Sequence, residues 1–536
     1  MRICTSAEMA AIDRATIAGG VSGEELMERA GGRITEEILA FREDEGELPD
    51  VPGRVLVVCG KGNNGGDGLV VARLLAQRGW DTAVLLLAPA RELSEDAQLN
   101  YGRLPGGVQV LPAENGRWGE QARDVGADAD VVVDAVFGTG IEPPLRGPYP
   151  ELIAALNTLP GLRVAVDMPS GVAGDDGAVD PVAFAADLTV TVGLPKLGLL
   201  LPPGRDCTGE LRVVDIGFPE DLCRAHTGDR CYLRQHDYAA LLPPRASSDH
   251  KYRCGHLLVL AGSRAYSGAA VLTAWGALRS GVGLTTLGMP AVVEMAARAQ
   301  LPEVIVAPLD VTDGGTLAPL SPGTLQDLLD RKTALAVGPG LGEHPATDRW
   351  VVEVAAAVDR PMVFDADAIS AFARAGAEPR FATGDAVLTP HAGELGRVLS
   401  LPPAEVMRRR FELLPELARR WSATILLKGS PTVVAAPDGC TTVNPLGGDE
   451  LAHGGTGDVL TGLVGGLLAQ GVRGPDAAVL GAYLHGRAGQ VAAGERGRRS
   501  VLAREVAEGI AVALRGLEEI AALDPELRRR VRPLHS

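Results

Sequence analysis

The feature that most restricts the fold of this chain is a repeated alternation of short Val-, Leu- and Ile-rich runs with longer alanine-rich segments. The apolar runs are residues 55–59, 83–88, 131–133, 163–166 and 188–192 in the first half, and 257–260, 335–337, 362–364, 386–388 and 424–427 in the second. This alternation is typical of βαβ units, in which helices cover both faces of a parallel sheet. The sequence therefore predicts an α/β protein with two domains, each a mostly parallel sheet flanked by helices.

A segment rich in Pro, Ser and charged residues interrupts the alternation between residues 218 and 251, and it includes LLPPRASSDHK. Such a composition is typical of a boundary between folded parts. The chain of 536 residues is also long for one core, since domains usually contain ~100–200 residues. We expect one domain over residues 1–225 and a second over residues 226–520.

The composition excludes some classes of partner. Lys and Arg total 51 against 68 Asp and Glu, a net charge of -17, which argues against binding to nucleic acid or to an anionic membrane. No apolar stretch reaches the ~18 residues of a membrane span, and no secretory signal is expected. The seven cysteines are scattered and form no Cys-x-x-Cys pair, which indicates reduced thiols and a cytoplasmic location. A homo-oligomer is expected.

Polar loops follow three of the predicted strands in the first half. They read GKGNNGGDG at residues 60–68, DAVFGTGIEPP from residue 134 and DMPSG from residue 167. Ligands of open parallel sheets bind at the carboxyl ends of the strands, so these loops are expected to surround one cleft. The polar side chains that they bring there are Asn63, Asn64, Asp67, Asp134, Asp167 and Ser170.

The first loop also fits G-x-G-x-x-G, the fingerprint of a dinucleotide cofactor site. Such a site needs an acid after the second strand for the ribose, and residues 87–90 read LAPA. In addition, the charge of Asp67 would repel a pyrophosphate. Asn and Asp oxygens are ligands for hard cations, so a cation-assisted substrate loop is the better interpretation. Each residue alone could equally serve a turn or a helix cap.

GKGNNGGDG, VVDAVFGTG, VDMPSGV and the ending DIGFP resemble the motifs of NAD(P)H-hydrate epimerases over residues 1–220, which implies a Rossmann-like domain. The resemblance implies contacts to the hydrated nucleotide from Asn63, Asn64, Gly65, Gly66, Asp67, Gly138, Thr139, Gly140, Ile141, Glu142, Pro143, Pro144 and Asp167. It also implies a K+ ion held by Asn64, Asp134 and Ser170.

The chemistry of epimerisation suits a carboxyl group at this cleft. Hydrated NAD(P)H carries a hydroxyl at C6 of the nicotinamide ring as R and S epimers. Their exchange requires the hydroxyl to leave and return on the other face, or the ring to open. A carboxylic acid that donates and then withdraws a proton can catalyse either route. We predict that Asp167 is this catalytic residue.

The second half contains GGTGDVLTGLVGGLLAQG, a glycine-rich turn that opens an apolar helix at about residue 456. Free backbone N–H groups and the positive end of a helix can hold a phosphoryl group there. Asp458 falls in the first turn, where it could take the proton from a hydroxyl as the phosphorus approaches. The motif alone is weak, since many such turns are ordinary helix entries.

Further motifs accompany it in a fixed order: AGS, SGAA, GPGLG, DADA, TPHAGE and LLKG. Together they resemble the ribokinase-like family, and within it the NAD(P)H-hydrate dehydratases, over residues 230–515. The resemblance implies that Ala269, Gly340, His391 and Asp458 face the hydrated nucleotide, and that Lys428, Gly429, Ser430, Pro431, Thr432 and Gly457 hold ADP. It implies Mg2+ at this site, and phosphorylation of the C6 hydroxyl followed by elimination, which restores NAD(P)H.

Three residues of these motifs have simpler interpretations. His391 could be a satisfied structural histidine, and Asp365 and Asp367 more often hold loops than a metal. The family usually carries TGN-x-x-M-A before GGTGD, whereas residues 446–452 here read LGGDELA. The acids at positions 449 and 450 would repel a phosphate unless they point outward or bind magnesium.

The leading hypothesis is a bifunctional repair enzyme, an epimerase followed by an S-specific dehydratase that converts ADP to AMP and phosphate. Its partners would be hydrated NADH or NADPH and ADP. The alternative is a ribokinase-like kinase of a vitamin or sugar alcohol, preceded by a non-catalytic nucleotide-binding domain.

Overall fold

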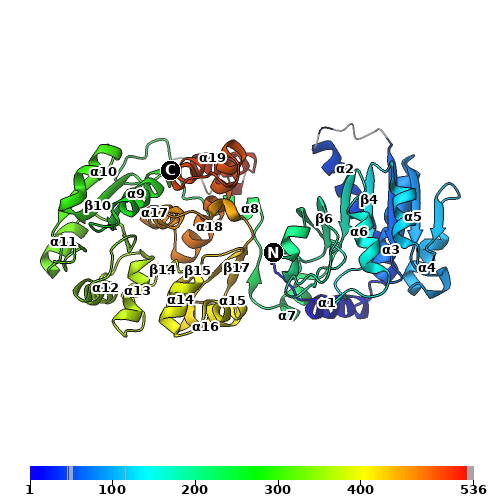
Figure 1. Cartoon of the computed structure of the whole chain (residues 1–536), viewed down its shortest axis with the longest axis horizontal. Coiled ribbons are helices and arrows are strands. Elements are labelled where there is room, and N and C mark those ends of the chain that lie inside the picture. The colour runs from blue at the N-terminus through cyan, green and yellow to red at the C-terminus, as the bar shows by residue number, and fades with distance from the viewer. Residues whose placement is uncertain (45, 47–51, 115, 525, 528–536) are drawn as a thin grey trace. The chain divides into compact units, whose positions relative to one another are not determined.

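The computed structural model describes residues 1–44, 46, 52–114, 116–524 and 526–527. Its chain divides into two compact units, Met1–Arg230 and Cys231–Ser536 (Figure 1). Both are α/β units built on mostly parallel sheets, which confirms the predicted fold class. No helix of the described ranges is long and apolar enough to cross a membrane.

The first unit is built on a seven-stranded sheet in the order β3-β2-β1-β4-β5-β6-β7, with every neighbouring pair parallel. The strands are β1 (Arg54–Cys59), β2 (Asp81–Leu86), β3 (Gln109–Pro112), β4 (Val131–Ala135), β5 (Leu162–Val166), β6 (Leu188–Val192) and β7 (Glu210–Val214). After β1 the chain builds β2 and β3 on one side and then crosses to β4 on the other. The loops after β1 and β4 therefore part at a switch point, where ligands of such sheets bind.

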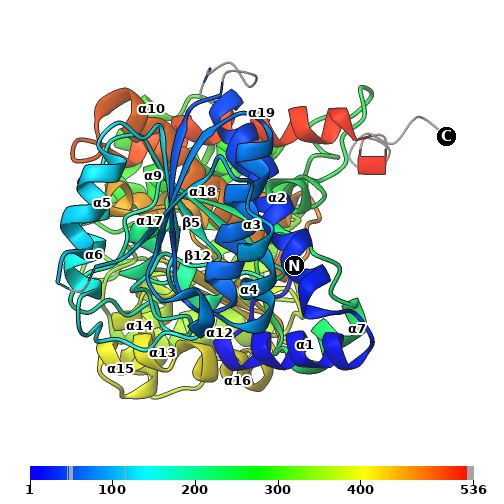
Figure 2. The same ribbon diagram turned by 90° about the vertical axis from the view of Figure 1, so that its right-hand side faces the viewer.

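Helices cover both faces of this sheet. They are α1 (Ser6–Ala18), α2 (Gly23–Asp44), α3 (Asn63–Gln77), α4 (Glu95–Gly102), α5 (Trp118–Gly126), α6 (Tyr149–Leu156) and α7 (Glu220–His226). Alternate residues of β1 point to opposite faces, so Val57 packs with α2, α3 and α4, while Leu56 packs with α5 and α6. Figure 2 shows these two groups of helices on opposite sides of the strands.

The second unit is built on a ten-stranded sheet in the order β11-β10-β9-β12-β13-β14-β15-β16-β17-β8. Its strands are β8 (Arg230–Cys231), β9 (His256–Leu260), β10 (Leu284–Pro290), β11 (Ile305–Leu309), β12 (Ala334–Val337), β13 (Met362–Phe364), β14 (Ala386–Leu388), β15 (Thr424–Leu427), β16 (Thr432–Ala435) and β17 (Thr441–Asn444). The pairs from β11 to β15 are parallel, and β15, β16 and β17 are antiparallel.

The helices of this unit also form two groups (Figure 1). One core contains α9 (Ser267–Arg279), α17 (Thr456–Ala469), α18 (Gly474–Arg496) and α19 (Ala503–Leu523), and the other contains α12 (Pro345–Ala357), α13 (Asp367–Arg374), α14 (Ala392–Leu399) and α16 (Arg410–Trp421). Shorter helices are α8 (Gln235–Ala239), α10 (Glu294–Gln300), α11 (Pro322–Leu329) and α15 (Pro403–Arg408).

Helix α17 is held against α9 by a very close backbone approach. A Cβ atom at Gly462 would lie 1.8 Å from the carbonyl oxygen of Thr273, and one at Gly276 would lie 2.0 Å from that of Val459. Only glycine permits these distances, because no other residue lacks a Cβ. The crossing therefore fixes the start of α17, which carries Asp458.

We predict that Gly462→Ala lowers the thermal unfolding midpoint of the second unit by about 3–8 °C, because overpacking a core costs roughly 1–3 kcal/mol. The measurement is differential scanning calorimetry of the full chain. Gly494→Ala in α18 is the matched control, since a Cβ there meets open space and alanine favours a helix. Equal midpoints for Gly462→Ala and the unmodified chain would contradict the role of this crossing.

Candidate active sites

The site in the first unit begins where the loops after β1 and β4 meet. A Cβ atom at Gly60 would lie 2.1 Å from the carbonyl oxygen of Val136, and one at Gly65 would lie 2.0 Å from the carbonyl oxygen of Gly60. Glycine at position 60 lets the first loop approach the second, and glycine at position 65 lets the first turn of α3 pack back against Gly60. The two loops are thereby brought to one edge of the sheet.

A cavity of about 530 Å³ opens at this edge, within the usual size range of ligand sites. The predicted residues that line it are Asn63, Asn64, Asp67, Gly138, Thr139, Gly140, Ile141 and Asp167. Helices α1 and α2 add an apolar wall that contains Met9, Ile17, Leu26 and Met27. The structure thus brings together polar groups from three loops and an apolar surface wide enough for a ring.

The remaining predicted residues of this unit lie around the main cavity. Gly65 and Gly66 are buried in the first turns of α3. Glu142, Pro143 and Pro144 line an adjacent cavity of about 340 Å³, which shares Phe137, Ile141 and Tyr149 with the first. Asp134 and Ser170 are fully buried.

Asp134 and Ser170 form a tight oxygen-rich contact beneath the loops. Asp134 Oδ1 accepts from Ser170 Oγ at 2.7 Å and from Val136 N at 3.2 Å, while Oδ2 accepts from Ser170 N at 2.7 Å. Ser170 Oγ itself accepts from Phe137 N at 2.9 Å. Burial raises the pKa of Asp134 to about 6, and no Lys or Arg of the described chain pairs with it. Such a buried, uncompensated carboxylate suits a bound cation.

Asp167 comes directly after β5 and has a φ of 66°, a strained left-handed conformation for a residue other than glycine. Its Oδ1 atom forms an ion pair with the Lys196 ammonium and accepts from Thr191 Oγ1 at 3.2 Å and from Val192 N at 3.1 Å. Lys196 is only 1% exposed and also lines the cavity. The sequence motifs did not identify Lys196 as a site residue. Its only distinguishing feature in the sequence is that it is a single lysine within the apolar stretch GLPKLG.

The site in the second unit forms around the start of α17. Asp458 lies in the first turn of this helix, and Lys428 follows β15. Lys428 Nζ donates to Asp365 Oδ1 at 2.7 Å and would lie 3.3 Å from a Cβ placed on Gly457. Thr461 Oγ1 donates to the other oxygen of Asp365 at 2.6 Å. Burial and the negative charge of Asp365 raise the pKa of Asp458 to about 7, which suits a base near neutral pH.

Other predicted residues of this unit occupy neighbouring loops. A Cβ on Gly340 would lie 2.8 Å from that of Ala269, so these two residues are close together. His391 caps α14, with Nδ1 accepting from Gly393 N at 3.0 Å. Asp367 accepts from Gly342 N at 2.8 Å. Gly429, Ser430 and Pro431 form the turn between β15 and β16, and Thr432 is the first residue of β16.

The two acids in the loop before α17 lie beside one arginine. Asp449 and Glu450 lie in a short 3-10 helix (Asp449–Leu451). Arg498 Nη2 lies 2.5 Å from Asp449 Oδ1 and 3.5 Å from Glu450 Oε2, and Glu450 Oε1 accepts from Gly448 N at 2.8 Å. The two carboxylates therefore face Arg498, whose positive charge compensates part of their negative charge.

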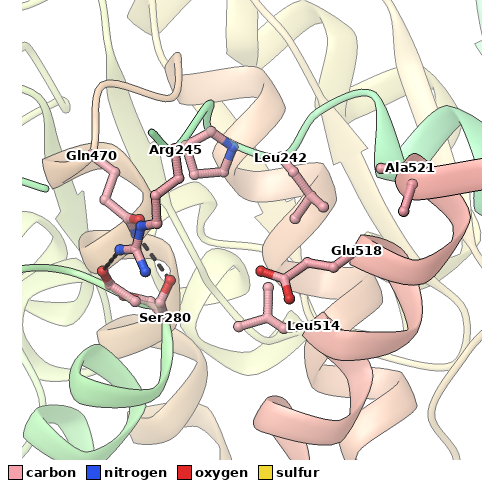
Figure 3. Close-up of a pocket in the computed structure, with 10 residues that line it drawn as sticks. Leu242, Arg245, Ser280, Gln470, Leu514, Glu518 and Ala521 are labelled. Atoms are coloured by element: carbon pink, nitrogen blue, oxygen red, sulfur yellow. Dashed lines mark hydrogen bonds between the residues drawn. The ribbon is translucent and has the colours of Figure 1, made fainter. Parts of the chain in front are cut away.

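Within the described ranges, no group of three or more His, Cys, Asp or Glu is arranged to hold a metal. A small cavity of about 80 Å³ lies elsewhere in the second unit, lined by residues that include Leu242, Arg245, Ser280, Gln470 and Glu518 (Figure 3). None of the predicted site residues lines it.

Relatives of known name cover almost the whole chain. A bifunctional NAD(P)H-hydrate repair enzyme of Moorella thermoacetica is 40% identical and covers 97% of this chain and 98% of its own length. One of Thermofilum pendens is 37% identical, with 97% of each chain covered. This chain belongs to the bifunctional NAD(P)H-hydrate repair enzymes. The family assignment and the enzyme class expected from the motifs are thereby confirmed.

The family models agree with this membership in the repair enzymes. A model described as NAD(P)H-hydrate dehydratase matches residues 257–511, and one described as YjeF-related protein N-terminus matches residues 23–198. Among solved structures, an ADP/ATP-dependent NAD(P)H-hydrate dehydratase of Bacillus subtilis, crystallised with ATP and Mg2+, is 32% identical. It covers 53% of this chain and 98% of its own, with a TM-score of 0.46.

We predict that Arg498→Gln weakens ADP binding by about 5-fold, because it leaves two carboxylates uncompensated close to the start of α17. Isothermal titration calorimetry of the full chain measures the affinity. Arg499→Gln removes the same charge from the next residue, which is exposed, and is expected to change the affinity by less than about 2-fold. Equal affinities for the two variants would show that the pairing of Arg498 has no influence on the nucleotide.

Proposed function

We propose that this chain repairs hydrated NAD(P)H in two reactions, one in each unit. The first unit interconverts the R and S epimers at C6, and the second removes water from the S epimer while ADP is converted to AMP and phosphate. The observation that carries the proposal is that each unit presents a carboxyl group at the edge of its sheet. Asp167 lines the large cavity, and Asp458 has a pKa of about 7 at the start of α17. The full-length relatives do not favour the alternative of a vitamin or sugar-alcohol kinase.

In the first unit, the cavity between the loops and α1 would hold the hydrated ring beside Asp167. Its carboxyl group would move the proton that epimerisation requires at the C6 hydroxyl. The adjacent cavity at Glu142, Pro143 and Pro144 would take a further part of the nucleotide. Gly138 would leave room for the ligand, because a Cβ there would lie 3.3 Å from Asp167 Oδ2.

We propose K+ for the first unit, held by Asn64, Asp134 and Ser170. All three residues supply hard oxygen donors, the ligands that such cations prefer. One feature of the described residues fits a cation: Asp134 is a buried carboxylate without a basic partner. A bound K+ would supply positive charge beneath the loops and so favour one arrangement of them.

In the second unit, Asp458 would take the proton from the C6 hydroxyl, whose oxygen forms a bond to the β-phosphorus of ADP as AMP leaves. The phosphate then departs with the electron pair of the C6–O bond, and loss of a proton from C5 restores the double bond of NAD(P)H. Lys428, Gly457 and the turn of residues 429–432 would hold the phosphates, and Ala269, Gly340 and His391 would face the nicotinamide. Mg2+ would accompany the phosphates and reduce their charge.

The test uses the separated epimers of hydrated NADH with the full chain and ADP, and it follows the absorbance of the reduced nicotinamide. We expect both epimers to be restored by the unmodified chain. Asp458→Asn should abolish recovery of both, whereas Asp167→Asn should slow recovery of the R epimer about 100-fold or more and leave that of the S epimer unchanged. No recovery of the S epimer by the unmodified chain would refute the proposed dehydration.

The raised pKa of Asp458 predicts a pH dependence. A base must be ionised, so kcat of the dehydration should rise with pH and reach half its maximum at about pH 7. Asp365→Asn removes the negative charge that contributes to this rise in pKa, so the midpoint should move to lower pH. Initial rates with the S epimer and saturating ADP measure both profiles, and a flat profile across neutral pH would contradict the role of Asp458 as the base.

A further inference from the structure

The two oxygens of Asp167 have different surroundings. Oδ1 accepts from Lys196, from Thr191 Oγ1 at 3.2 Å and from Val192 N at 3.1 Å. Oδ2 accepts no hydrogen bond from the described residues and lies 3.3 Å from the position that a Cβ on Gly138 would take. Because Asp167 and Gly138 both line the cavity, Oδ2 is the oxygen that faces a ligand.

Lys196 uses all of its donors inside the protein. An ammonium has three N–H groups, and those of Lys196 reach Asp167 Oδ1, Thr191 Oγ1 at 3.1 Å and Val192 O at 2.8 Å. The side chain is 1% exposed, and a buried ammonium is stable only beside an anion. Lys196 is therefore the counter-ion of Asp167, and it has no donor left to bind a substrate.

Asp67 lies in the opposite electrostatic environment, although it lines the same cavity from α3. No hydrogen bond or ion pair of the described residues stabilises its charge. Burial and the negative charges of Asp167 and Asp13 raise the pKa of Asp67 well above its usual value, and only Lys196 opposes them. Burial and these neighbouring charges therefore favour the protonated form of Asp67.

The ionisable side chains that line the cavity are Asp13, Lys61, Asp67, Asp96, Tyr149, Asp167 and Lys196. Burial also raises the pKa of Asp13 and of Tyr149, and the charge of Asp96 raises that of Asp13 further. The buried ammonium pairs with Asp167 alone. Asp167, which has a counter-ion, and Asp67, which has none among the described residues, are thus two carboxyl groups with unlike surroundings in one cavity.

We propose that epimerisation uses Asp167 as the base and Asp67 as the acid, and that Lys196 is the positioning residue that assigns these roles. The proposal rests on the epimerase function of the first unit. Asp167 Oδ2 takes the proton of the C6 hydroxyl, and the C6–N1 bond breaks with its electron pair moving to N1. Asp67 protonates N1, so that the ring is open and C6 is an aldehyde carbon. Rotation about C5–C6 exposes the other face of this aldehyde to N1, and the reverse proton transfers close the ring on that face. Both carboxyl groups return to their initial states, so no further reactant is needed.

The experiment measures the rate at which the full chain converts the R to the S epimer without ADP, across about pH 5–9. The epimers are separated by chromatography, and the uncatalysed rate is subtracted. The variants are Lys196→Met, Lys196→Arg and Asp67→Asn. Asp124→Asn, an exposed residue of α5, is the control for loss of a carboxylate. Dehydration of the S epimer with ADP by the same preparations reports whether the second unit is intact, and differential scanning calorimetry reports whether the first unit is folded.

We expect Lys196→Met and Asp67→Asn each to lower the conversion rate about 100-fold or more while dehydration of the S epimer is unchanged. In Lys196→Met the rising limb of the pH profile should move to higher pH, because the positive charge beside Asp167 is then lost, and Lys196→Arg should restore much of the rate. In Asp67→Asn the falling limb at high pH should disappear. Asp124→Asn should behave as the unmodified chain.

A uniform loss of rate in Lys196→Met, with an unmoved rising limb, would overturn the positioning role. Retention of the falling limb in Asp67→Asn would overturn Asp67 as the acid. Both results would leave the epimerase function intact, since the unmodified chain would still interconvert the epimers. No conversion by the unmodified chain would instead refute the proposed function, and the inference with it.

Discussion

Close approach of one backbone to another at glycine positions determines where both sites form. In the first unit, Gly60 lets the loop after β1 approach the loop after β4, and Gly65 lets the first turn of α3 pack against Gly60. In the second unit, Gly462 holds α17 against α9 at a distance that no Cβ could occupy. Each contact fixes the start of a helix, and each helix carries a carboxyl group, Asp67 or Asp458, close to its start. A shift of either helix would displace its acid from the neighbouring charged groups.

The two acids are tuned by the same physical effects but are suited to opposite tasks. Burial and a neighbouring carboxylate raise the pKa of both Asp67 and Asp458. Asp458 reaches about 7, so it can take a proton from a hydroxyl near neutral pH. The pKa of Asp67 is raised well above its usual value, and Asp67 has no ion pair among the described residues. These surroundings suit a proton donor. Phosphoryl transfer requires a base beside the attacking hydroxyl, whereas exchange of epimers requires an acid and a base together.

The sequence was sufficient to predict the fold class and the strands of the sheet centres. Residues 131–133 and 188–192 lie in β4 and β6, because buried parallel strands are continuous apolar runs. Strands with a weak apolar signal were missed. β3 (QVLP) and β7 (ELRVV) are largely accessible edge strands, and β10 contains polar threonines. Partial exposure removes the pattern by which a strand is recognised.

The candidate sites were predictable only where residues adjoin a strand end. Asn64, Asp67 and Asp167 were identified in this way, and the structure brings all three to one cavity. Lys196 and Arg498 were not, because their partners are distant in sequence. Lys196 pairs with a residue 29 positions away, and Arg498 pairs with acids on the far side of α17 and α18 in the chain. A single lysine in an apolar stretch gives no indication of its partner until the fold is known.

A lysine–aspartate pair in each unit explains why a second aspartate there is available to exchange a proton. An ammonium that is largely withdrawn from water needs a negative partner, and Lys428 pairs with Asp365 rather than with Asp458. Asp458 is thereby left near a negative charge without a direct ion pair, and its pKa rises. In the first unit Lys196 pairs with Asp167, and Asp67 is the carboxyl group left without a partner among the described residues. In both units the lysine stabilises one carboxylate so that a second one, close by, can exchange its proton.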